Sequence, residues 1–340
     1  MSPAQRLTRR RTLQGCGAFL CSAFAAAPVC AARRRPGGTL GTPELETPRP
    51  ESPRLEPPRL ETQVVAPGIH IRRGLDEDAT ARNADAIANT GFIVGRDSVA
   101  VFDPGGSLAD GERLRARIRE VTAAPIRYVL LSHGHPDHIF GAGAFLPDRP
   151  LFIGHARLPE ALAQRGEYYQ KTLDAILGKD SAGPVIVPSR LVTDRDAIEL
   201  GDRTLLLTAH GVAHSDCDMS VLDPLTGTLL AGDLLFVERI PSLDGRLTGW
   251  QRELAALKTT AATRAVPGHG PVSVEWPAGA LDLERYLDVL LRDTRAAVRQ
   301  GMDLRRAVTR VGRSERGKWK LFDDYQGHNV TQAYKEVEWE

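Results

Sequence analysis

The sequence predicts one layered α/β domain that runs from about residue 63 to residue 340. Two observations predict it. Short β-rich runs alternate with amphipathic helical segments along this span, and groups of His and Asp directly follow several of the apolar runs. Alternating strand and helix signals are typical of folds in which helices cover the faces of a sheet. The second observation indicates that the chemistry of the domain lies at the ends of its strands.

The expected elements follow one another in order. The first strands are expected at residues 64–72, 87–94 and 99–102, where Gly and Asp separate β-rich runs. Residues 109–123 predict a helix, because Leu114, Ile118 and Val121 recur on one face. Residues 126–131 form a nearly continuous apolar run, as expected of a strand buried on both faces. Later strands are expected at residues 196–209, 219–223 and 228–231, and later helices at about residues 249–260 and 278–300.

Two segments depart from this alternation. The stretch 156–190 fits a strand pattern poorly, and we interpret it as a mostly helical insertion that walls a cleft. Near the C-terminus, apolar residues recur at helical spacing, which predicts a terminal helix docked on the core. These residues are Val330, Ala333, Tyr334 and Val337.

The charge balance excludes one class of ligand. The chain holds 44 Lys and Arg against 43 Asp and Glu, a formal net charge of +1. The expected domain is mildly acidic, with 34 basic and 38 acidic side chains in residues 63–340. Binding of nucleic acid through a basic surface is therefore not expected, and the expected ligand is a small-molecule substrate.

The first 62 residues predict an export signal and a tether. Residues 1–32 carry four Arg and no acidic residue, with Arg9–Arg11 ahead of a weakly apolar, Ala-rich run. This pattern is typical of a twin-arginine signal peptide and not of a membrane span. Residues 33–62 contain seven prolines and little to bury, which predicts an extended tether. The expected location is the periplasm, without stable membrane insertion.

The densest group of ligating side chains directly follows the apolar run at 126–131. Residues 133–138 read His-Gly-His-Pro-Asp-His, and imidazole and carboxylate are ligand types that zinc prefers. His133 and His135 are two residues apart, so an extended chain points both the same way. Two more candidates follow the proline into a turn, so one motif can serve two neighbouring metal ions.

Further candidates follow later apolar runs. His214 lies in Ala-His-Ser-Asp, Asp233 follows Leu-Leu-Ala-Gly, and His269 lies in Pro-Gly-His-Gly. Taken alone, each has a plain alternative as a capping Asp or a hydrogen-bonded loop His. Asp103 follows the strand expected at 99–102, and its plain alternative is a turn residue.

These motifs together resemble the metallo-β-lactamase-fold hydrolase superfamily over about residues 64–275. The resemblance implies an αβ/βα four-layer sandwich with two zinc ions in a cleft at one edge of the sheets. It also implies roles for individual residues: Asp233 bridges the two zinc ions, and Asp103 orients a ligand. The first zinc would be held by His133, His135 and His214, and the second by Asp137, His138 and His269.

Two positions bear on these assignments. His210 competes with His214 for the third ligand of the first zinc, and we prefer His214 because its Gly-x-Ala-His-Ser context resembles the superfamily's third-histidine loop. His135 stands where the diiron oxygen-reductase branch carries Glu, which favours zinc hydrolysis. His70, His155 and His328 have no neighbouring ligand pattern, so we expect structural or surface roles for them.

A narrower resemblance rests on three segments, residues 88–95, 213–218 and 319–340. They are similar to the exported quinoprotein relay system zinc metallohydrolase group, type 2. Members of that group accompany PQQ-dependent dehydrogenases and their c-type cytochromes. The resemblance therefore implies a periplasmic quinoprotein dehydrogenase or c-type cytochrome as a partner.

The resemblance also implies a mechanism. Two zinc ions would supply a bridging hydroxide that attacks an ester, thioester or amide carbonyl, with Asp137 orienting it and carrying its proton. Cys217 has no Cys-x-x-Cys partner, and we expect a small core residue rather than a nucleophile. Several alternatives stay open: a true β-lactamase, a glyoxalase-II-like thioesterase, an iron sulfur-dioxygenase, and a non-hydrolytic accessory or maturation factor for a quinoprotein.

Overall fold

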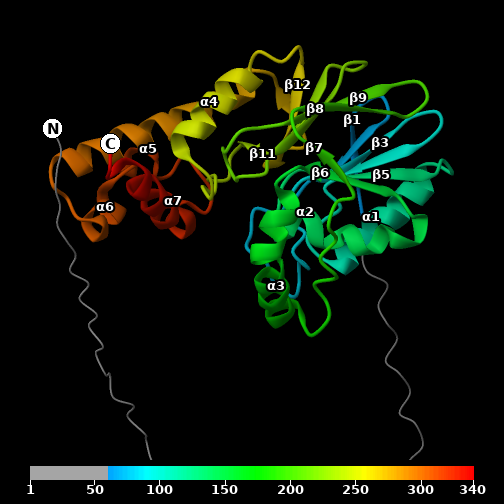
Figure 1. The fold of residues 1–340 in the computed structure, drawn as a ribbon, viewed down its shortest axis with the longest axis horizontal. Coiled ribbons are helices and arrows are strands. Elements are labelled where there is room, and N and C mark those ends of the chain that lie inside the picture. The colour runs from blue at the N-terminus through cyan, green and yellow to red at the C-terminus, as the bar shows by residue number, and fades with distance from the viewer. Residues whose placement is uncertain (1–59) are drawn as a thin grey trace, which may run out of the picture. The chain divides into compact units, whose positions relative to one another are not determined.

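The computed structural model describes residues 60–340. The expected signal peptide and all but the last three residues of the expected tether lie outside the described residues. Two mixed sheets form the centre of the described part (Figure 1). The first sheet has seven strands in the order β1-β2-β3-β4-β5-β6-β7. These are β1 (Gln63–Ala66), β2 (Ile69–Arg72), β3 (Thr90–Val94), β4 (Val99–Phe102), β5 (Ile126–Leu131), β6 (Leu151–His155) and β7 (Arg190–Val192).

The pairing direction changes within each sheet. In the first sheet, β1 to β4 pair antiparallel and β4 to β7 pair parallel. The second sheet has six strands in the order β13-β12-β11-β10-β9-β8, in which only β11 and β12 pair parallel. These are β8 (Arg195–Glu199), β9 (Thr204–Ala209), β10 (Met219–Asp223), β11 (Thr228–Phe236), β12 (Arg264–His269) and β13 (Val274–Glu275).

Helices cover the outer face of each sheet, so the domain has four layers. The longer helices are α1 (Leu108–Val121), α3 (Leu158–Leu177), α4 (Leu247–Leu257), α5 (Leu281–Arg299) and α7 (Phe322–Val337). The shorter ones are α2 (Pro136–Ile139), α6 (Leu304–Arg310) and the 3₁₀ turns η1 (Phe140–Asp148), η2 (Ala278–Ala280) and η3 (Arg313–Glu315). In Figure 1, α1 and α3 lie beside the first sheet, and α4, α5 and α7 form a group near the end marked C.

Three apolar clusters hold these layers together. One lies between the sheets, where Phe102 of β4 and Val221 of β10 are both buried. The second joins the first sheet to α1, η1 and α3, and the third joins the second sheet to α4, α5 and α7. Burial of apolar side chains on both faces of each sheet stabilises this arrangement. The predicted αβ/βα four-layer sandwich is confirmed.

The structure corrects four of the expected strands. The runs 64–72 and 196–209 are each two strands, because turns at Gly68 and Gly201 with positive φ interrupt them. The run expected at 87–94 begins only at Thr90, since the Asn89 backbone N–H donates to the Gly268 carbonyl (2.6 Å) instead of joining the ladder. The run expected at 228–231 continues to Phe236 because β12 pairs along it through two register shifts.

The C-terminal helix α7 is docked on the core. Val330, Ala333 and Val337 are buried in the cluster formed with α4 and α5. The Glu336 carboxylate accepts hydrogen bonds from the backbone N–H groups of Leu247 and Thr248 (2.6 and 3.2 Å). It therefore caps the N-terminus of α4, which has no side-chain cap from its own N-cap residue. Among residues 60–340, no helix is both long and apolar enough to cross a membrane.

Candidate metal centre

Four segments meet at one edge of the two sheets, and one of them, β11, carries its candidate ligand inside the strand. The loop after β5 carries His133 and His135, and α2 begins in the middle of the same motif. The loop between β9 and β10 carries His214, β11 carries Asp233, and β12 carries His269. The structure brings together all seven side chains proposed as metal ligands. They form two groups: His133, His135, His214 and Asp233, and Asp137, His138 and His269, with the ligating atoms of each group within 4.8 Å of one another.

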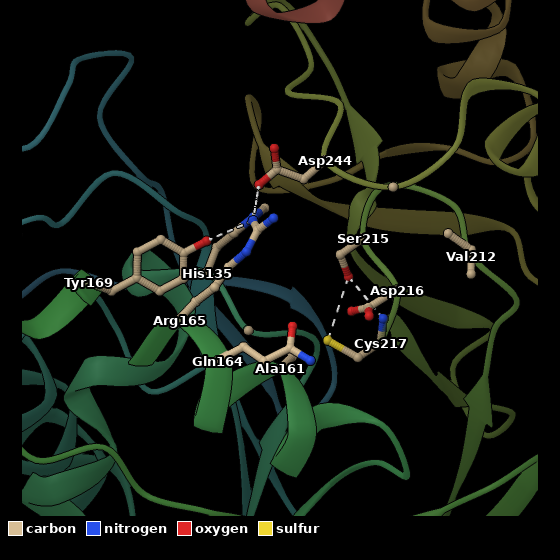
Figure 2. Close-up of a pocket in the computed structure, with 12 residues that line it drawn as sticks. His135, Ala161, Gln164, Arg165, Tyr169, Val212, Ser215, Asp216, Cys217 and Asp244 are labelled. Atoms are coloured by element: carbon tan, nitrogen blue, oxygen red, sulfur yellow. Dashed lines mark hydrogen bonds and ion pairs between the residues drawn. The ribbon is translucent and has the colours of Figure 1, made fainter. Parts of the chain in front are cut away.

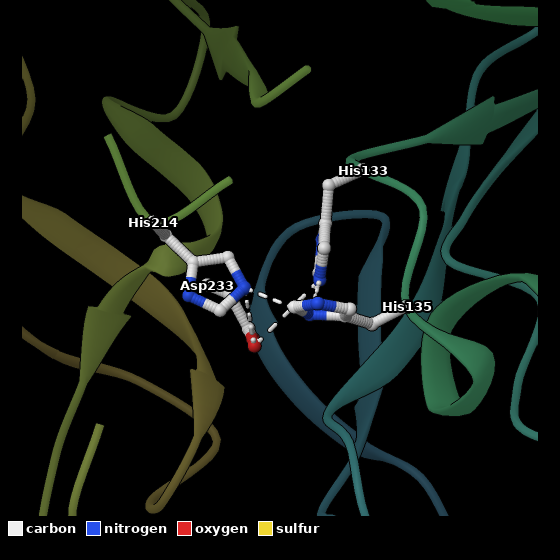
Figure 3. A group of neighbouring side chains, drawn as sticks. All are labelled: His133, His135, His214 and Asp233. Atoms are coloured by element: carbon white, nitrogen blue, oxygen red, sulfur yellow. Dashed lines mark hydrogen bonds and ion pairs between the residues drawn. The ribbon is translucent and has the colours of Figure 1, made fainter. Parts of the chain in front are cut away.

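In the first group, one atom of each side chain points to a common centre (Figure 3). His135 Nδ1 lies 3.0 Å from His133 Nε2 and 2.9 Å from His214 Nε2. The Oδ2 atom of Asp233 lies 3.7 Å from His133 Nε2 and 3.4 Å from His214 Nε2. Three nitrogens and one carboxylate oxygen at these separations are a fitting donor set for a four-coordinate divalent metal.

Asp233 also faces the second group. Its Oδ1 atom lies 3.1 Å from His138 Nε2 and 3.5 Å from His269 Nε2. The Asp137 Oδ2 atom completes this group, 3.2 Å from His269 Nε2 and 3.5 Å from His138 Nε2. A Cβ on Gly268 would lie 1.9 Å from Asp233 Oδ1, so the chain has room for this carboxylate only because residue 268 is glycine. The two oxygens of Asp233 thus face the two groups separately.

Every imidazole in the two groups is oriented by an acceptor outside its group. His214 Nδ1 lies 2.7 Å from the Ser242 carbonyl, and His135 Nε2 lies 2.8 Å from Asp244 Oδ2. His133 Nδ1, His138 Nδ1 and His269 Nδ1 face Ser132 Oγ, Asp103 Oδ2 and the Ile87 carbonyl at 2.9, 2.8 and 3.0 Å. Donation to these acceptors places each ring proton on the outer nitrogen. Five lone pairs therefore point inward.

These inward atoms require a positive charge between them. His138 Nε2 and Asp233 Oδ1 are buried and have no hydrogen-bond partner in the described part of the chain. Buried lone pairs that face one another at about 3 Å repel, and leaving such groups unpaired costs about 1–3 kcal/mol each. A divalent metal in each group relieves this repulsion, so the residues present fit the metal that the fold implies.

The pKa shifts agree with a cation site. Burial lowers the pKa of His133 well below its usual range and that of His214 to about 4, so both imidazoles stay neutral as metal binding requires. Burial also acts to lower the pKa of His138, but the carboxylates around it, Asp233 foremost, outweigh burial and raise that pKa well above its usual value. The second group therefore strongly favours positive charge.

Hydrogen bonds to the Asp103 carboxylate hold the motif at residues 133–138 in place. Asp103 is fully buried at the end of β4 and has a positive φ of 50°. Its Oδ1 accepts the Ser132 backbone N–H (2.8 Å), and its Oδ2 accepts both Ser132 Oγ (2.7 Å) and His138 Nδ1 (2.8 Å). One carboxylate thus fixes the start of the motif and the ring of His138. Such outer contacts set the ring orientation and the tautomer of a metal-binding histidine.

Two residues that the sequence did not single out for the site also orient it. Asp244 accepts hydrogen bonds from His135 Nε2 through Oδ2 and from His328 Nε2 (2.9 Å) through Oδ1. We expected a structural or surface role for His328, and α7 carries it to a carboxylate that also contacts the candidate ligand His135. The isolated Asp-Gly turn at residue 244 has no sequence signal that distinguishes it from other turns.

We expect Asp244→Ala to weaken metal binding about 10- to 100-fold, because His135 loses the acceptor that fixes its tautomer. The measurement is competition with a chromogenic chelator. Asp216→Ala is the matched control, since that carboxylate pairs with Arg157 (3.3 Å) and its loss should leave metal affinity unchanged. Equal affinities for Asp244→Ala and the parent protein would contradict the orienting role.

A cleft opens beside the two groups. One cavity of about 170 Å³ lies between α3 and the loops that carry His214 and Asp244 (Figure 2). Arg165 and Tyr169 of α3 line it, and their side chains lie 3.3 Å apart. A second cavity, of about 210 Å³, shares His135, Tyr169 and Asp244 with the first. Helix α3 occupies residues 158–177 of the stretch 156–190 and supplies one wall of the cleft.

His210 lies outside both groups. Its Nε2 atom lies 2.8 Å from Ser220 Oγ, and its Nδ1 atom lies 3.3 Å from Glu253 Oε2. These contacts join β9 and β10 to α4. Of the two competing histidines, the structure therefore places His214 with the candidate ligands and His210 beside β10 and α4.

Cys217 is buried, and burial strongly raises the pKa of its thiol. We expect slow alkylation of this thiol in the folded protein, and metal content and turnover within about twofold of the parent in Cys217→Ala. The measurements are mass spectrometry of alkylated protein and metal analysis. Loss of turnover with full metal content in Cys217→Ala would instead indicate a nucleophilic thiol.

Comparison with known proteins gives a family match and several fold matches. The model of the metallo-beta-lactamase superfamily matches residues 84–269. A linear primary-alkylsulfatase from Pseudomonas sp. is 28% identical over 97 residues, which are 28% of this chain and 17% of that protein. The chain therefore matches only a small part of this curated relative.

Solved structures share the fold at low sequence identity. A metallo-beta-lactamase from Pontibacter korlensis superposes with a TM-score of 0.54 at 16% identity, covering 66% of this chain and 99% of that chain. A stereoselective inverting sec-alkylsulfatase from Pseudomonas sp. gives a TM-score of 0.62 at 16% identity, covering 82% of this chain and 50% of that chain.

Proposed function

The chain belongs to the metallo-beta-lactamase superfamily, a family of hydrolases, and we propose that it is a zinc-dependent hydrolase that holds two zinc ions and cleaves an ester, thioester or amide bond. The observation that supports this proposal is the convergence of inward lone pairs from five oriented imidazoles. Zinc is proposed because imidazole nitrogen and carboxylate oxygen dominate the donor set and no described thiolate takes part.

The proposed ligands divide as the two groups do. His133, His135 and His214 would hold one zinc, and Asp137, His138 and His269 the other, with one oxygen of Asp233 toward each. When bound, zinc supplies acidified water at neutral pH and polarises the bond to be cleaved.

The protein supplies proton transfer and orientation. Burial acts to raise the pKa of Asp137, but its interactions with His138 and His269 outweigh burial and lower that pKa, and a zinc ion held by the same residues would favour the ionised carboxylate further. The Asp137 carboxylate is therefore ionised, and it lines the cavity, where it can accept a proton from attacking water. The contacts of Asp103 and Asp244 hold the neighbouring imidazoles still during this step.

A second candidate function is hydrolysis of a sulfate ester. The sequence similarity to a linear primary-alkylsulfatase favours it. The same proposed ligands would serve either reaction, because the ligands of a metal do not determine which bond is cleaved.

We also propose export by the twin-arginine route and action beside a periplasmic quinoprotein dehydrogenase or c-type cytochrome. The supporting features are Arg9–Arg11 and the segments similar to the quinoprotein relay group. Replacement of the three arginines by lysine should retain the protein in the cytoplasm, as cell fractionation would measure. Unchanged export would contradict the route.

The experiment that tests the proposed function combines metal analysis with reporter hydrolysis. Purified protein should hold about two zinc ions per chain and cleave at least one of a thioester, a cephalosporin and an alkyl sulfate reporter. The ratio of the three rates would identify the bond. One iron per chain would overturn the zinc proposal, and two zinc ions without turnover of any reporter would favour the accessory role.

A further inference from the structure

Arg239 is a buried guanidinium without a carboxylate partner. Its exposed fraction is 4%, and no carboxylate of the described chain lies within ion-pair distance of it. The other two strongly buried arginines each have one: Arg72 lies 2.7 Å from Asp110, and Arg203 lies 3.2 Å from Asp223. Burial of an unpaired charge is costly, so proteins rarely do it without a ligand to bind.

Two side chains, Tyr325 and His269, lie within hydrogen-bonding distance of Arg239, and they do not use all of its N–H groups. Arg239 Nη2 donates to Tyr325 Oη (3.1 Å), and Nη1 lies 3.2 Å from His269 Nδ1. The Nδ1 proton of His269 is directed at the Ile87 carbonyl (3.0 Å), and it must be on Nδ1 whenever Nε2 binds a metal. A protonated nitrogen accepts no hydrogen bond. In the metal-loaded protein, Nη1 therefore has no acceptor in His269.

Arg239 lines the cavity of about 210 Å³. Asp137, Asp233 and His269 line it too, so the guanidinium lies on the same cavity as the proposed reaction. The rest of the wall includes the apolar side chains of Ile87, Phe236 and Ile240. The Asp244 carboxylate also lines it, but its two oxygens accept hydrogen bonds from His135 and His328. A cavity with an apolar wall and one well-placed cation selects a small ligand with an apolar body and an anionic group.

The backbone holds Arg239 in place. Its neighbour Glu238 has a positive φ of 65°, and Leu321, opposite it, has a φ of 57°. Between them, the Lys320 N–H donates to the Glu238 carbonyl (2.7 Å), and the Ile240 N–H donates to the Lys320 carbonyl (3.1 Å). Two non-glycine residues in the left-handed region cost of order 1–3 kcal/mol each and persist where surrounding contacts enforce them. The backbone hydrogen bonds of Lys320, in the segment before α7, thus fix the turn that carries Arg239.

We propose that Arg239 binds an anionic group of the substrate, which is therefore a small organic monoanion with a short apolar body. This inference rests on the proposed hydrolase function. The guanidinium forms charge-assisted hydrogen bonds to planar or tetrahedral oxyanions alike. A carboxylate elsewhere on an ester and the sulfate of a sulfate ester share this chemistry.

The experiment uses the zinc-loaded, full-length protein and two kinds of probe. Calorimetry measures binding of butyrate and of butane-1-sulfonate, neither of which is cleaved. Reporter kinetics compare 4-nitrophenyl acetate, which is neutral, with the 4-nitrophenyl monoester of succinate and with 4-nitrophenyl sulfate. We expect Arg239→Met to weaken binding of the preferred anion about 10- to 100-fold and to raise KM for the anionic reporter equally, with the neutral reporter unchanged.

Two matched variants separate charge from fold. Arg239→Lys should recover part of the anion affinity. Lys320→Met removes a positive charge from the neighbouring segment before α7, but its ammonium group pairs with Asp76 and Glu238 (both 2.7 Å), and Lys320 does not line the cavity. This variant should bind both anions as the parent protein does.

Different results would overturn the anion-binding role of Arg239 and the proposed hydrolase function. Equal anion binding by the parent protein and Arg239→Met, or no binding by the parent, would overturn the role of Arg239 whatever the turnover. Equal losses for neutral and anionic reporters would also overturn it. Anion binding that depends on Arg239 without hydrolysis of any reporter would instead support the anion site and count against the hydrolase function. Stronger binding of the sulfonate than of butyrate would identify a sulfate ester as the source of the anion.

Discussion

Replacement of His135 with alanine should abolish hydrolysis. His135 Nδ1 is the central atom of the first group, 3.0 Å and 2.9 Å from the Nε2 atoms of His133 and His214. Its loss removes a metal ligand and also leaves Asp244 without its closest imidazole partner. We expect zinc content to fall by about one ion per chain and turnover to fall at least about a thousandfold, because a metal contributes several kcal/mol to catalysis.

His210→Ala is the control for this variant. His210 lies close to the candidate ligand His214 in the sequence, but its imidazole contacts Ser220 and Glu253 instead of the candidate ligands. Zinc content should stay at the parent value. Full zinc content and full turnover in His135→Ala, with loss of both in His210→Ala, would reverse the assignment of these two histidines.

A charge in the terminal helix should have the largest effect on stability. Val330 is fully buried between α7 and the core. Aspartate at this position would place a carboxylate in an apolar cluster without a partner. We expect Val330→Asp to lower the free energy of unfolding by about 3–5 kcal/mol, and Tm by roughly 10 °C. Thermal unfolding followed by circular dichroism would measure it.

The same substitution on the exposed face of α7 separates burial from helix propensity. Lys335 is exposed, and Lys335→Asp should cost less than about 1 kcal/mol. A Val330→Asp variant as stable as the parent would show that α7 does not depend on its apolar face. In that case the capping of α4 by Glu336 and the contact from His328 to Asp244 would also need other support.

The candidate ligands were predictable because their signal is local. Four of them lie within six residues, and the spacing of two for His133 and His135 sets their common direction whatever the rest of the chain does. The others follow apolar runs beside Gly or Pro. The fold of this region was predictable for the same reason, since strand and helix periodicities are read from neighbours along the chain.

The details of pairing were less predictable. Asp233 was expected after a strand, because a charged residue beside glycine commonly ends one. The structure places it inside β11, where all nine residues are buried. The imidazoles of the two groups and the absence of a side chain on Gly268 make room for its charge. Those compensating groups come from other segments, so the strand's own sequence does not reveal them.

The sequence by itself determined the class of fold and the set of residues that gather at the metal centre, because strand periodicity and a six-residue motif are local properties. Only the tertiary structure decided how that centre is oriented and what faces it. Asp244 contacts a histidine 109 positions earlier in the chain, and Arg239 contacts a tyrosine 86 positions later. Contacts at such separations arise from packing of whole layers, and along the chain an arginine that will be left unpaired looks like any other.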